Sequence, residues 1–205
     1  MAIAATYRSA FTPIRELRYH VVEWGPADAP VVIGLHGWMD CAATYQFLVD
    51  ALAMPIRFVA PDWRGHGRSQ WGPDGIYHYT DYLADLDFVL DLYSPGRPAV
   101  ILGHSLGGNI ASVYAGVRPD RVKALVNVDG FGLWSGDPQR AAGYMRGWLA
   151  ELHKETSRRV YPSPDEMIER LADVSTRVSA ERARFIVGEW AEPATGGGWR
   201  MRADP

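Results

Sequence analysis

The sequence predicts an α/β protein with a mainly parallel open sheet, helices on both faces of that sheet and a helical lid. Two observations carry this prediction. Short apolar segments recur along the first part of the chain and alternate with segments of helical periodicity. A later part of the chain holds only helical patterns. Strands without polar alternation are buried on both faces, as the strands of a parallel sheet are.

The first extended segment, Ile14–Trp24, mixes aromatic and β-branched residues with charges and ends at Gly25-Pro26. We expect one or two antiparallel strands here, at an edge of the sheet. Four apolar segments follow, and each predicts a buried strand: Val31–Leu35, Ile56–Ala60, Ala99–Gly103 and Ala124–Val128.

Apolar residues at three- and four-residue spacing predict a helix between successive strands. The first helix covers 45–52 behind Asp40 as N-cap, the second 82–93 behind Thr80, and the third 106–117. This alternation implies right-handed crossovers, with ligands bound beyond the carboxyl ends of the strands. Four acidic residues of the second helix are interpreted as a solvated face: Asp81, Asp85, Asp87 and Asp91.

After Asp129 three helices are predicted, over Pro138–Arg158, Ser163–Ala172 and Ser179–Trp190. Ser163 and Glu166 have the spacing of a capping box. Gly196 to Gly198 are expected to form a flexible joint, followed by an extended segment. We therefore divide the chain into a core at 1–132, a helical lid at 133–198 and the start of the return to the core at 199–205.

Composition describes an ordinary globular protein of 205 residues, with 47% apolar residues and a formal net charge of −3. The length suggests one large domain, or one domain that carries an insertion. Basic residues are scattered, which argues against a nucleic acid partner. A single cysteine, Cys41, favours neither a disulfide framework nor a metal cage, and it is interpreted as a small apolar residue. No segment reaches the ~18 apolar residues that span a bilayer. We expect a cytoplasmic protein, and the oligomeric state stays open.

The most informative segment is Ala99–Gly108, in which a buried strand passes through Gly-His-Ser-Leu-Gly into an amphipathic helix. This is the G-x-S-x-G pattern between a strand and a helix. Its glycines allow a sharp turn that presents the hydroxyl of Ser105 at the head of the helix. The sequence therefore predicts Ser105 as a catalytic nucleophile.

Two backbone N–H groups are candidates to bind the oxyanion that forms on an attacked carbonyl. Leu106 is the first residue of the helix behind Ser105. Trp38 belongs to His36-Gly37-Trp38, which directly follows an earlier buried strand. Gly37 lets the backbone approach closely, so we expect the N–H groups of Leu106 and Trp38 to act as donors.

Three segments together resemble the α/β-hydrolase superfamily, in its lidded, serine-nucleophile, esterase-like branch: His-Gly-Trp at 36–38, Asp-Trp-Arg-Gly-His-Gly-Arg-Ser at 62–69 and Gly-His-Ser-Leu-Gly-Gly at 103–108. The resemblance covers 14–132 and, more loosely, the lid. It implies an α/β-hydrolase fold, with Ser105 as nucleophile, Trp38 and Leu106 as oxyanion donors, and the 62–69 turn as a largely structural element. A serine also disfavours relatives with an aspartate nucleophile, because a hydroxyl suits acyl transfer.

The chain departs from the family's order of serine, acid and histidine, because no histidine follows His153. His20, His36, His66, His78 and His104 are each interpreted as structural, and only His153 has a place from which it could swing toward the pocket. The resemblance offers Asp129, directly after the fourth apolar strand, as a possible acid. A loop carboxylate with a structural role is the alternative.

If the sheet ended at Ala124–Val128, an apolar strand would form an open edge, which natural proteins avoid. We therefore expect a fragment that is truncated before the catalytic histidine and lacks the family's C-terminal strands. A complete but degenerate hydrolase, or a sheet completed by another polypeptide, are the alternatives.

The resulting hypothesis is hydrolysis of an ester or related acyl bond through an acyl-Ser105 intermediate, without a cofactor or a metal. The partner would be a small-molecule ester or acyl substrate. Aromatic residues of the lid favour an apolar one: Trp134, Tyr144, Trp148 and Trp190. A C–C bond hydrolase, an acyltransferase and a non-catalytic binding module are the rival functions.

Overall fold

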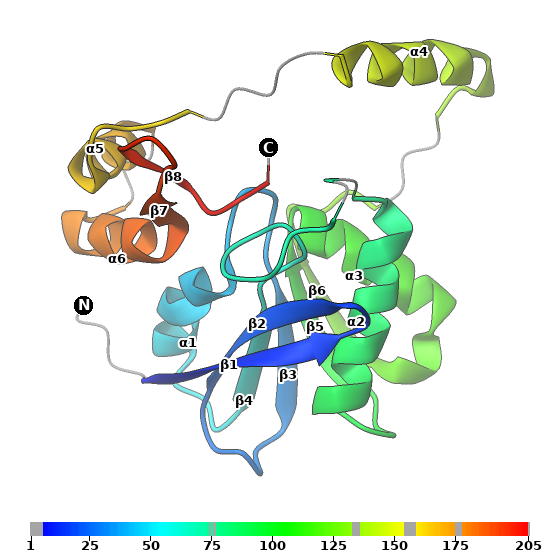
Figure 1. The fold of residues 1–205 in the computed structure, drawn as a ribbon. Coiled ribbons are helices and arrows are strands. Elements are labelled where there is room, and N and C mark those ends of the chain that lie inside the picture. The colour runs from blue at the N-terminus through cyan, green and yellow to red at the C-terminus, as the bar shows by residue number, and fades with distance from the viewer. Residues whose placement is uncertain are drawn as a thin grey trace.

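A six-stranded sheet forms the centre of the fold (Figure 1). The computed structural model describes residues 6–73, 75, 77–132, 136–153, 159–174 and 178–204. Within them the strand order is β1-β2-β4-β3-β5-β6. The strands are β1 (Tyr7–Ile14), β2 (Leu17–Trp24), β3 (Val31–Leu35), β4 (Arg57–Pro61), β5 (Ala99–His104) and β6 (Val122–Val128).

Strands β4, β3, β5 and β6 run parallel. The hairpin of β1 and β2 adds antiparallel to β4, so that β1 is one edge of the sheet. The four predicted apolar strands are present. The segment expected at the antiparallel edge, Ile14–Trp24, contains β2, but the edge strand β1 lies almost wholly before that segment and was not predicted. Because the four parallel strands share one direction, their carboxyl ends lie at the same end of the sheet. The loops that follow β3, β4, β5 and β6 come together there.

Helices cover both faces of the sheet, as predicted (Figure 1). One face packs against α2 (Tyr79–Tyr93) and α3 (Leu106–Val117). The other face packs against the segment that contains α1 (Gln46–Leu52). The two cores are built from alternate residues of the same strands, as the period of a strand requires. Examples are Ile33 on the first face and Val32 on the second.

The predicted N-cap residues of the first two helices are wrong. A short 3-10 helix, Ala42–Tyr45, precedes α1, and Asp40 lies before it. The Asp40 carboxylate instead accepts from the neighbouring N–H of Cys41 at 2.8 Å. Helix α2 starts one residue before Thr80, with His78 at its N-cap position.

The predicted solvated face of α2 is also wrong in part. Asp85 has no exposed surface and receives two hydrogen bonds from the Arg64 guanidinium. Asp87 accepts from the hydroxyl of Tyr114. Asp91, the last of the four acidic residues along α2, is solvated as expected, because its side chain is 60% exposed. Charge pattern alone does not show which partner a neighbouring loop brings to a helix.

The segment after residue 132 contains α4 (Ala141–Glu151), α5 (Pro164–Val174) and α6 (Ala180–Trp190). Of the first predicted lid helix, 154–158 lie outside the described residues. The Ser163 hydroxyl accepts from the N–H of Glu166 at 3.4 Å, as the capping-box spacing predicts.

The three glycines 196–198 form a hairpin turn rather than a joint. They connect β7 (Ala191–Pro193) with β8 (Trp199–Met201), which pair antiparallel. All three have positive φ, which glycine adopts without strain. Just after β8, Ala203 pairs with His66 of the core in an isolated bridge. The proposed division at residues 132 and 198 stays a prediction.

Helix α6 is fixed to the core, whereas α4 is not packed against it. The Glu189 carboxylate accepts from the Tyr7 hydroxyl at 3.0 Å and from the Arg68 guanidinium at 2.9 Å. The Trp190 indole N–H donates to Asp40 at 3.1 Å. Every residue of α4 is exposed, and Figure 1 shows this helix apart from the sheet.

Strand β6 is not buried on both faces, contrary to the expectation from its apolar sequence. Val126 and Val128 are each 46% exposed. The reason is its position, since β6 is the last strand in the sheet order of the described residues.

Among all the described residues, no helix combines the length and the apolar character that crossing a membrane requires.

Candidate active site

Ser105 occupies the sharp turn between β5 and α3. Its backbone has φ 48° and ψ −112°, a conformation that L-residues rarely adopt. Such a residue stores about 1–3 kcal/mol of strain and persists only where its surroundings hold it. Here the Ser105 N–H donates to the carbonyl of Val128 at 2.9 Å. A Cβ at Gly103 would lie 2.4 Å from the carbonyl oxygen of Gly107, so the turn requires glycine at that position.

The loop after β3 lies directly against Ser105. A Cβ at Gly37 would approach the Cβ of Ser105 to 3.3 Å, which places the 36–38 backbone beside the serine. Neither the N–H of Trp38 nor that of Leu106 has a hydrogen-bond acceptor among the described residues. The fold therefore brings Ser105 together with the loop and the helix end that carry the two unused backbone donors.

His36 fixes the orientation of the Gly37–Trp38 peptide. Its Nε2 accepts from the backbone N–H of Trp63 at 2.8 Å, so Nδ1 carries the proton and donates to the carbonyl of Gly37, also at 2.8 Å. In a planar trans peptide, C=O and N–H point in opposite directions. Because the Gly37 carbonyl points at the His36 ring, the N–H of Trp38 points away from it.

Trp38 is 53% exposed, and its ring makes a T-shaped contact with His66 at 4.9 Å between ring centroids. Burial, and to a smaller extent the nearby His36, together lower the pKa of His66 to about 4. The neutral ring donates from Nδ1 to the carbonyl of Arg64 at 3.0 Å. His66 thus supports the Trp38 ring as an uncharged aromatic group.

Asp62 is the centre of the 62–69 turn. Its carboxylate accepts from the N–H of Ala42 at 2.6 Å, from the N–H of Arg68 at 2.8 Å and from Nδ1 of His20 at 2.8 Å. Burial by itself would raise the pKa of Asp62, but the bonds from His20 and the backbone outweigh burial and lower it. Asp62 therefore stays ionised and ties β2, β4 and the segment before α1 together.

Sequence reasoning missed the pairing of His20 with Asp62. The two residues are far apart in the chain, and only the antiparallel pairing of β2 with β4 brings them into contact. No local signal predicts it. The thiol of Cys41 lies nearby, and burial raises its pKa, so it remains protonated.

None of the six histidines, all of which lie in the described residues, forms a hydrogen bond with the Ser105 hydroxyl. Three of them are buried and bonded elsewhere, namely His20, His36 and His66. The others are exposed. His153, the one proposed to swing toward the pocket, follows α4 and lies with that exposed helix.

Asp129 follows β6 and has φ 59°, in the left-handed region that aspartate tolerates better than most residues. Its neighbour Val128 supplies the carbonyl that accepts from Ser105, so the backbones of Asp129 and Ser105 are close. The exposed carboxylate of Asp129 has no partner among the described residues.

The aromatic residues that the sequence assigned to the lid have different surroundings. Trp134 lies outside the described residues. Tyr144 and Trp148 are exposed on α4, and Trp190 is bonded to Asp40. Nothing in the described part of the chain gathers three or more His, Cys, Asp or Glu side chains in a way that would hold a metal ion.

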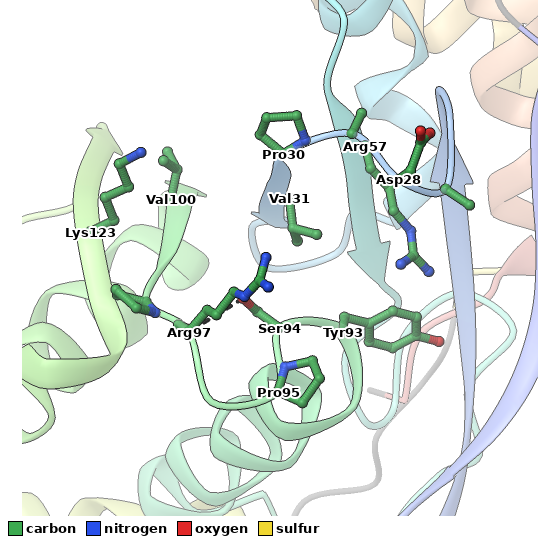
Figure 2. A pocket seen from close by; sticks show the side chains of 13 residues that line it. Asp28, Pro30, Val31, Arg57, Tyr93, Ser94, Pro95, Arg97, Val100 and Lys123 are labelled. Atoms are coloured by element: carbon green, nitrogen blue, oxygen red, sulfur yellow. Dashed lines mark hydrogen bonds between the residues drawn. The ribbon is translucent and has the colours of Figure 1, made fainter.

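A cavity of about 590 Å³ opens at the other end of the parallel strands from Ser105, and Figure 2 shows the residues that line it. It lies at the amino ends of the parallel strands, where β3 begins at Val31 and β4 at Arg57. The six residues of β5 run from this end of the sheet to the end that carries Ser105, a distance of roughly 20 Å. This cavity is therefore not part of the Ser105 site.

Comparison with known proteins places these features in context. A family model described as alpha/beta hydrolase fold matches residues 30–181. A serine hydrolase-like protein of Danio rerio is 32% identical over 192 residues, which are 90% of this chain and 58% of that protein. An esterase of Mycobacterium tuberculosis is 33% identical over 186 residues, 89% of this chain and 59% of that protein.

Among solved structures, a thioesterase domain from the curacin biosynthetic pathway is similar, with a TM-score of 0.86 and 26% identity. The match covers 97% of this chain and 70% of that domain. The chain spans about three fifths of the length of the two curated relatives named above.

Proposed function

This chain belongs to the α/β-hydrolase fold family, and on that premise we propose that it hydrolyses an ester or related acyl bond through a covalent acyl-Ser105 intermediate. One observation carries the proposal. Ser105 is held at positive φ between a strand and a helix, beside two backbone N–H groups to which the described residues offer no acceptor. Donors fixed in advance where negative charge develops are the usual source of acyl-transfer catalysis.

In this mechanism the Ser105 oxygen bonds to the acyl carbon while its proton passes to a histidine base, and the carbonyl oxygen becomes an oxyanion. The N–H groups of Leu106 and Trp38 receive that charge, and His36 keeps the Trp38 N–H in position. The bond to the leaving group breaks as the base gives that group its proton, and the alcohol or thiol leaves. Water, with the same base accepting its proton, then attacks the Ser105 ester and releases the acid. The names of the relatives, which include an esterase and a thioesterase, support this class of substrate.

We propose that the histidine base lies outside these 205 residues and that Asp129 is the carboxylate that orients it. The support is that no histidine of the described residues bonds to Ser105, while the nearby Asp129 carboxylate has no partner in that part of the chain. General-base catalysis contributes about 10²–10⁴-fold. The hydroxyl of Ser105 is expected to react slowly in this chain.

Trp38 is exposed in the 36–38 loop beside Ser105, and its ring supports an apolar or aryl acyl group as the substrate. We propose the same small-molecule substrate class for the whole protein. Comparison of turnover on aryl esters, acyl thioesters and vinylogous diketones would separate ester hydrolysis from its C–C bond alternative.

Labelling with a fluorophosphonate tests the proposal. Ser105 should be modified slowly in the 205-residue chain, as followed by peptide mapping of the serine itself. Added imidazole should accelerate this labelling, because it supplies the missing base. The variant Ser105→Ala is the control and should lose the modified peptide.

Two outcomes would contradict the proposal. Rapid labelling of Ser105 without imidazole would show that a histidine of this chain reaches it. No labelling with imidazole present would favour a binding module without catalytic function.

A further inference from the structure

A second serine of this chain lies in a Ser–His–Asp arrangement, distinct from the site of Ser105. The hydroxyl of Ser9 is 2.6 Å from Nε2 of His20. The other ring nitrogen of His20, Nδ1, is 2.8 Å from the carboxylate of Asp62. In a catalytic triad, Nε2 faces the hydroxyl and Nδ1 faces the carboxylate, as in this arrangement.

Three neighbouring strands build the arrangement. Ser9 lies on the edge strand β1, His20 on β2, and Asp62 directly after β4. Ser9 and Phe11 are two residues apart on β1, so their side chains lie on the same face of that strand. Phe11 is paired with His20 of β2. Lateral pairing of the strands thus brings residues 9, 20 and 62 into one line.

Burial is distributed as a reactive serine requires. His20 and Asp62 are each only 2% exposed, whereas Ser9 is exposed. A reagent can therefore reach the hydroxyl while the base and the carboxylate are shielded from water. Charge interactions are stronger in such a shielded environment than at the surface.

Asp62 is suited to stabilise a protonated His20. It is ionised and held by backbone N–H groups of Ala42 and Arg68, so its position does not depend on His20. A buried imidazole without a nearby anion would resist protonation. With Asp62 beside Nδ1, His20 can accept the proton of Ser9.

The surface around Ser9 contains an aromatic ring and a cation. Phe11 lies 5.3 Å from the His20 ring between centroids and is exposed. The guanidinium of Arg18 lies 4.4 Å from the centre of the Phe11 ring. Phe11 thus offers an exposed aromatic surface, two residues along β1 from Ser9, against which the ring of an aryl ester can pack.

We propose that Ser9, His20 and Asp62 form a second acyl-accepting site, which reacts with small activated aryl esters at the outer edge of the sheet. The Ser9 oxygen bonds to the acyl carbon while its proton passes to Nε2 of His20. The bond to the aryl oxygen breaks, and the phenol leaves with that proton. Water then attacks the Ser9 ester, again with His20 as base, and the carboxylic acid is released.

The test measures acetylation of Ser9 by 4-nitrophenyl acetate in the Ser105→Ala chain, with each serine resolved by peptide mass mapping. Ser179 is the internal control, because it is exposed and its hydroxyl has no side-chain partner within the described residues, where it accepts from the N–H of Arg182. General-base assistance predicts that Ser9 reacts about 100-fold faster than Ser179 or more. Equal rates at the two serines would overturn the proposal.

The role of His20 is tested with His20→Gln, and His78→Gln, at an exposed position, is the matched control. Ser9 should fall to the rate of Ser179 in the first variant and keep its rate in the second. A folded His20→Gln chain, judged by near-ultraviolet circular dichroism, that still acetylates Ser9 rapidly would contradict the proposal. If that variant does not fold, the comparison of Ser9 with Ser179 still decides. The Ser105→Ala background makes either result independent of the function proposed for Ser105.

Discussion

His36 connects two loops that the chain order separates, and its ring uses both nitrogens to do so. Nε2 accepts from the N–H of Trp63, and Nδ1 donates to Gly37. The Trp63 indole N–H in turn donates to the His36 carbonyl at 3.0 Å. The loop beside Ser105 is therefore positioned by a side chain that touches no reacting atom.

The first prediction concerns the stability that this ring provides. His36→Ala leaves the buried N–H of Trp63 without an acceptor and removes a fully buried side chain. We expect a loss of about 3 kcal/mol in the free energy of unfolding, measured by urea denaturation. His78→Ala, at an exposed position, should change it by less than ~0.5 kcal/mol. Equal stability of the two variants would contradict this account of His36.

The second prediction concerns His66 and pH. Its folded-state pKa of about 4 lies below the 6.5 of an ordinary histidine. As pH falls, the unfolded chain therefore binds the proton first, and the folded state loses stability between pH 6.5 and pH 4. The difference corresponds to about 3 kcal/mol at most. Above pH 6.5 this contribution is constant.

His66→Gln should remove that part of the pH dependence. The measurement is the free energy of unfolding at pH 7 and at pH 4.5, in the parent chain and in the variant. The decrease should be smaller in His66→Gln, whereas His78→Gln should retain the full decrease. An unchanged decrease in His66→Gln would show that the imidazole at position 66 is not the group responsible.

At the scale of elements, α2 is held to the 62–69 turn by a buried ion pair. The Arg64 guanidinium donates to Asp85 through Nε at 2.6 Å and through a second nitrogen at 2.8 Å. The Tyr19 hydroxyl also donates to Asp85, and burial followed by this carboxylate raises the pKa of Tyr19. One carboxylate thus connects a helix, a strand and a turn.

The third prediction compares two aspartates of the same helix. Asp85→Asn removes the nearest and only fully buried counterion that the described residues give Arg64, and it leaves the more distant carboxylates of Glu16 at 3.5 Å and Asp81 at 3.7 Å. We expect destabilisation by about 3 kcal/mol. Asp91→Asn breaks an ion pair with Arg121 in which the aspartate is largely exposed. That change should amount to less than ~1 kcal/mol. Thermal or urea unfolding of both variants provides the measurement, and similar losses would contradict the ranking.

At the scale of the whole molecule, the sheet has two different edges. β1 carries polar and charged residues, whereas β6 presents Val126 and Val128, each 46% exposed. An exposed apolar edge strand is a template for pairing with another chain. The two edges therefore differ in their tendency to associate.

The fourth prediction follows from this difference. The 205-residue chain should associate as its concentration rises, measured by sedimentation velocity, and Val126→Lys should shift it toward the monomer. Val117→Lys is the matched control, because Val117 is 68% exposed but ends a helix. If both variants associate like the parent, the β6 edge is not the contact surface.

Local sequence determined the elements and the position of the serine. The apolar segments, the helical periods and the Gly-His-Ser-Leu-Gly turn each depend on neighbours within a few residues, and the structure has β5, Ser105 and α3 in that order. Even there, the first helix begins later than its expected N-cap, because Asp40 accepts from its own neighbour Cys41 instead of capping the helix.

Tertiary structure decided the partners of the charged and polar side chains. Asp85 is buried because a loop more than twenty residues away brings Arg64 to it, and His20 meets Asp62 only because β2 pairs with β4. Hydrophobic periodicity is a property of consecutive residues and can be read along the chain. Hydrogen bonds and ion pairs between distant residues depend on how strands and loops meet in space, which no short stretch of sequence specifies.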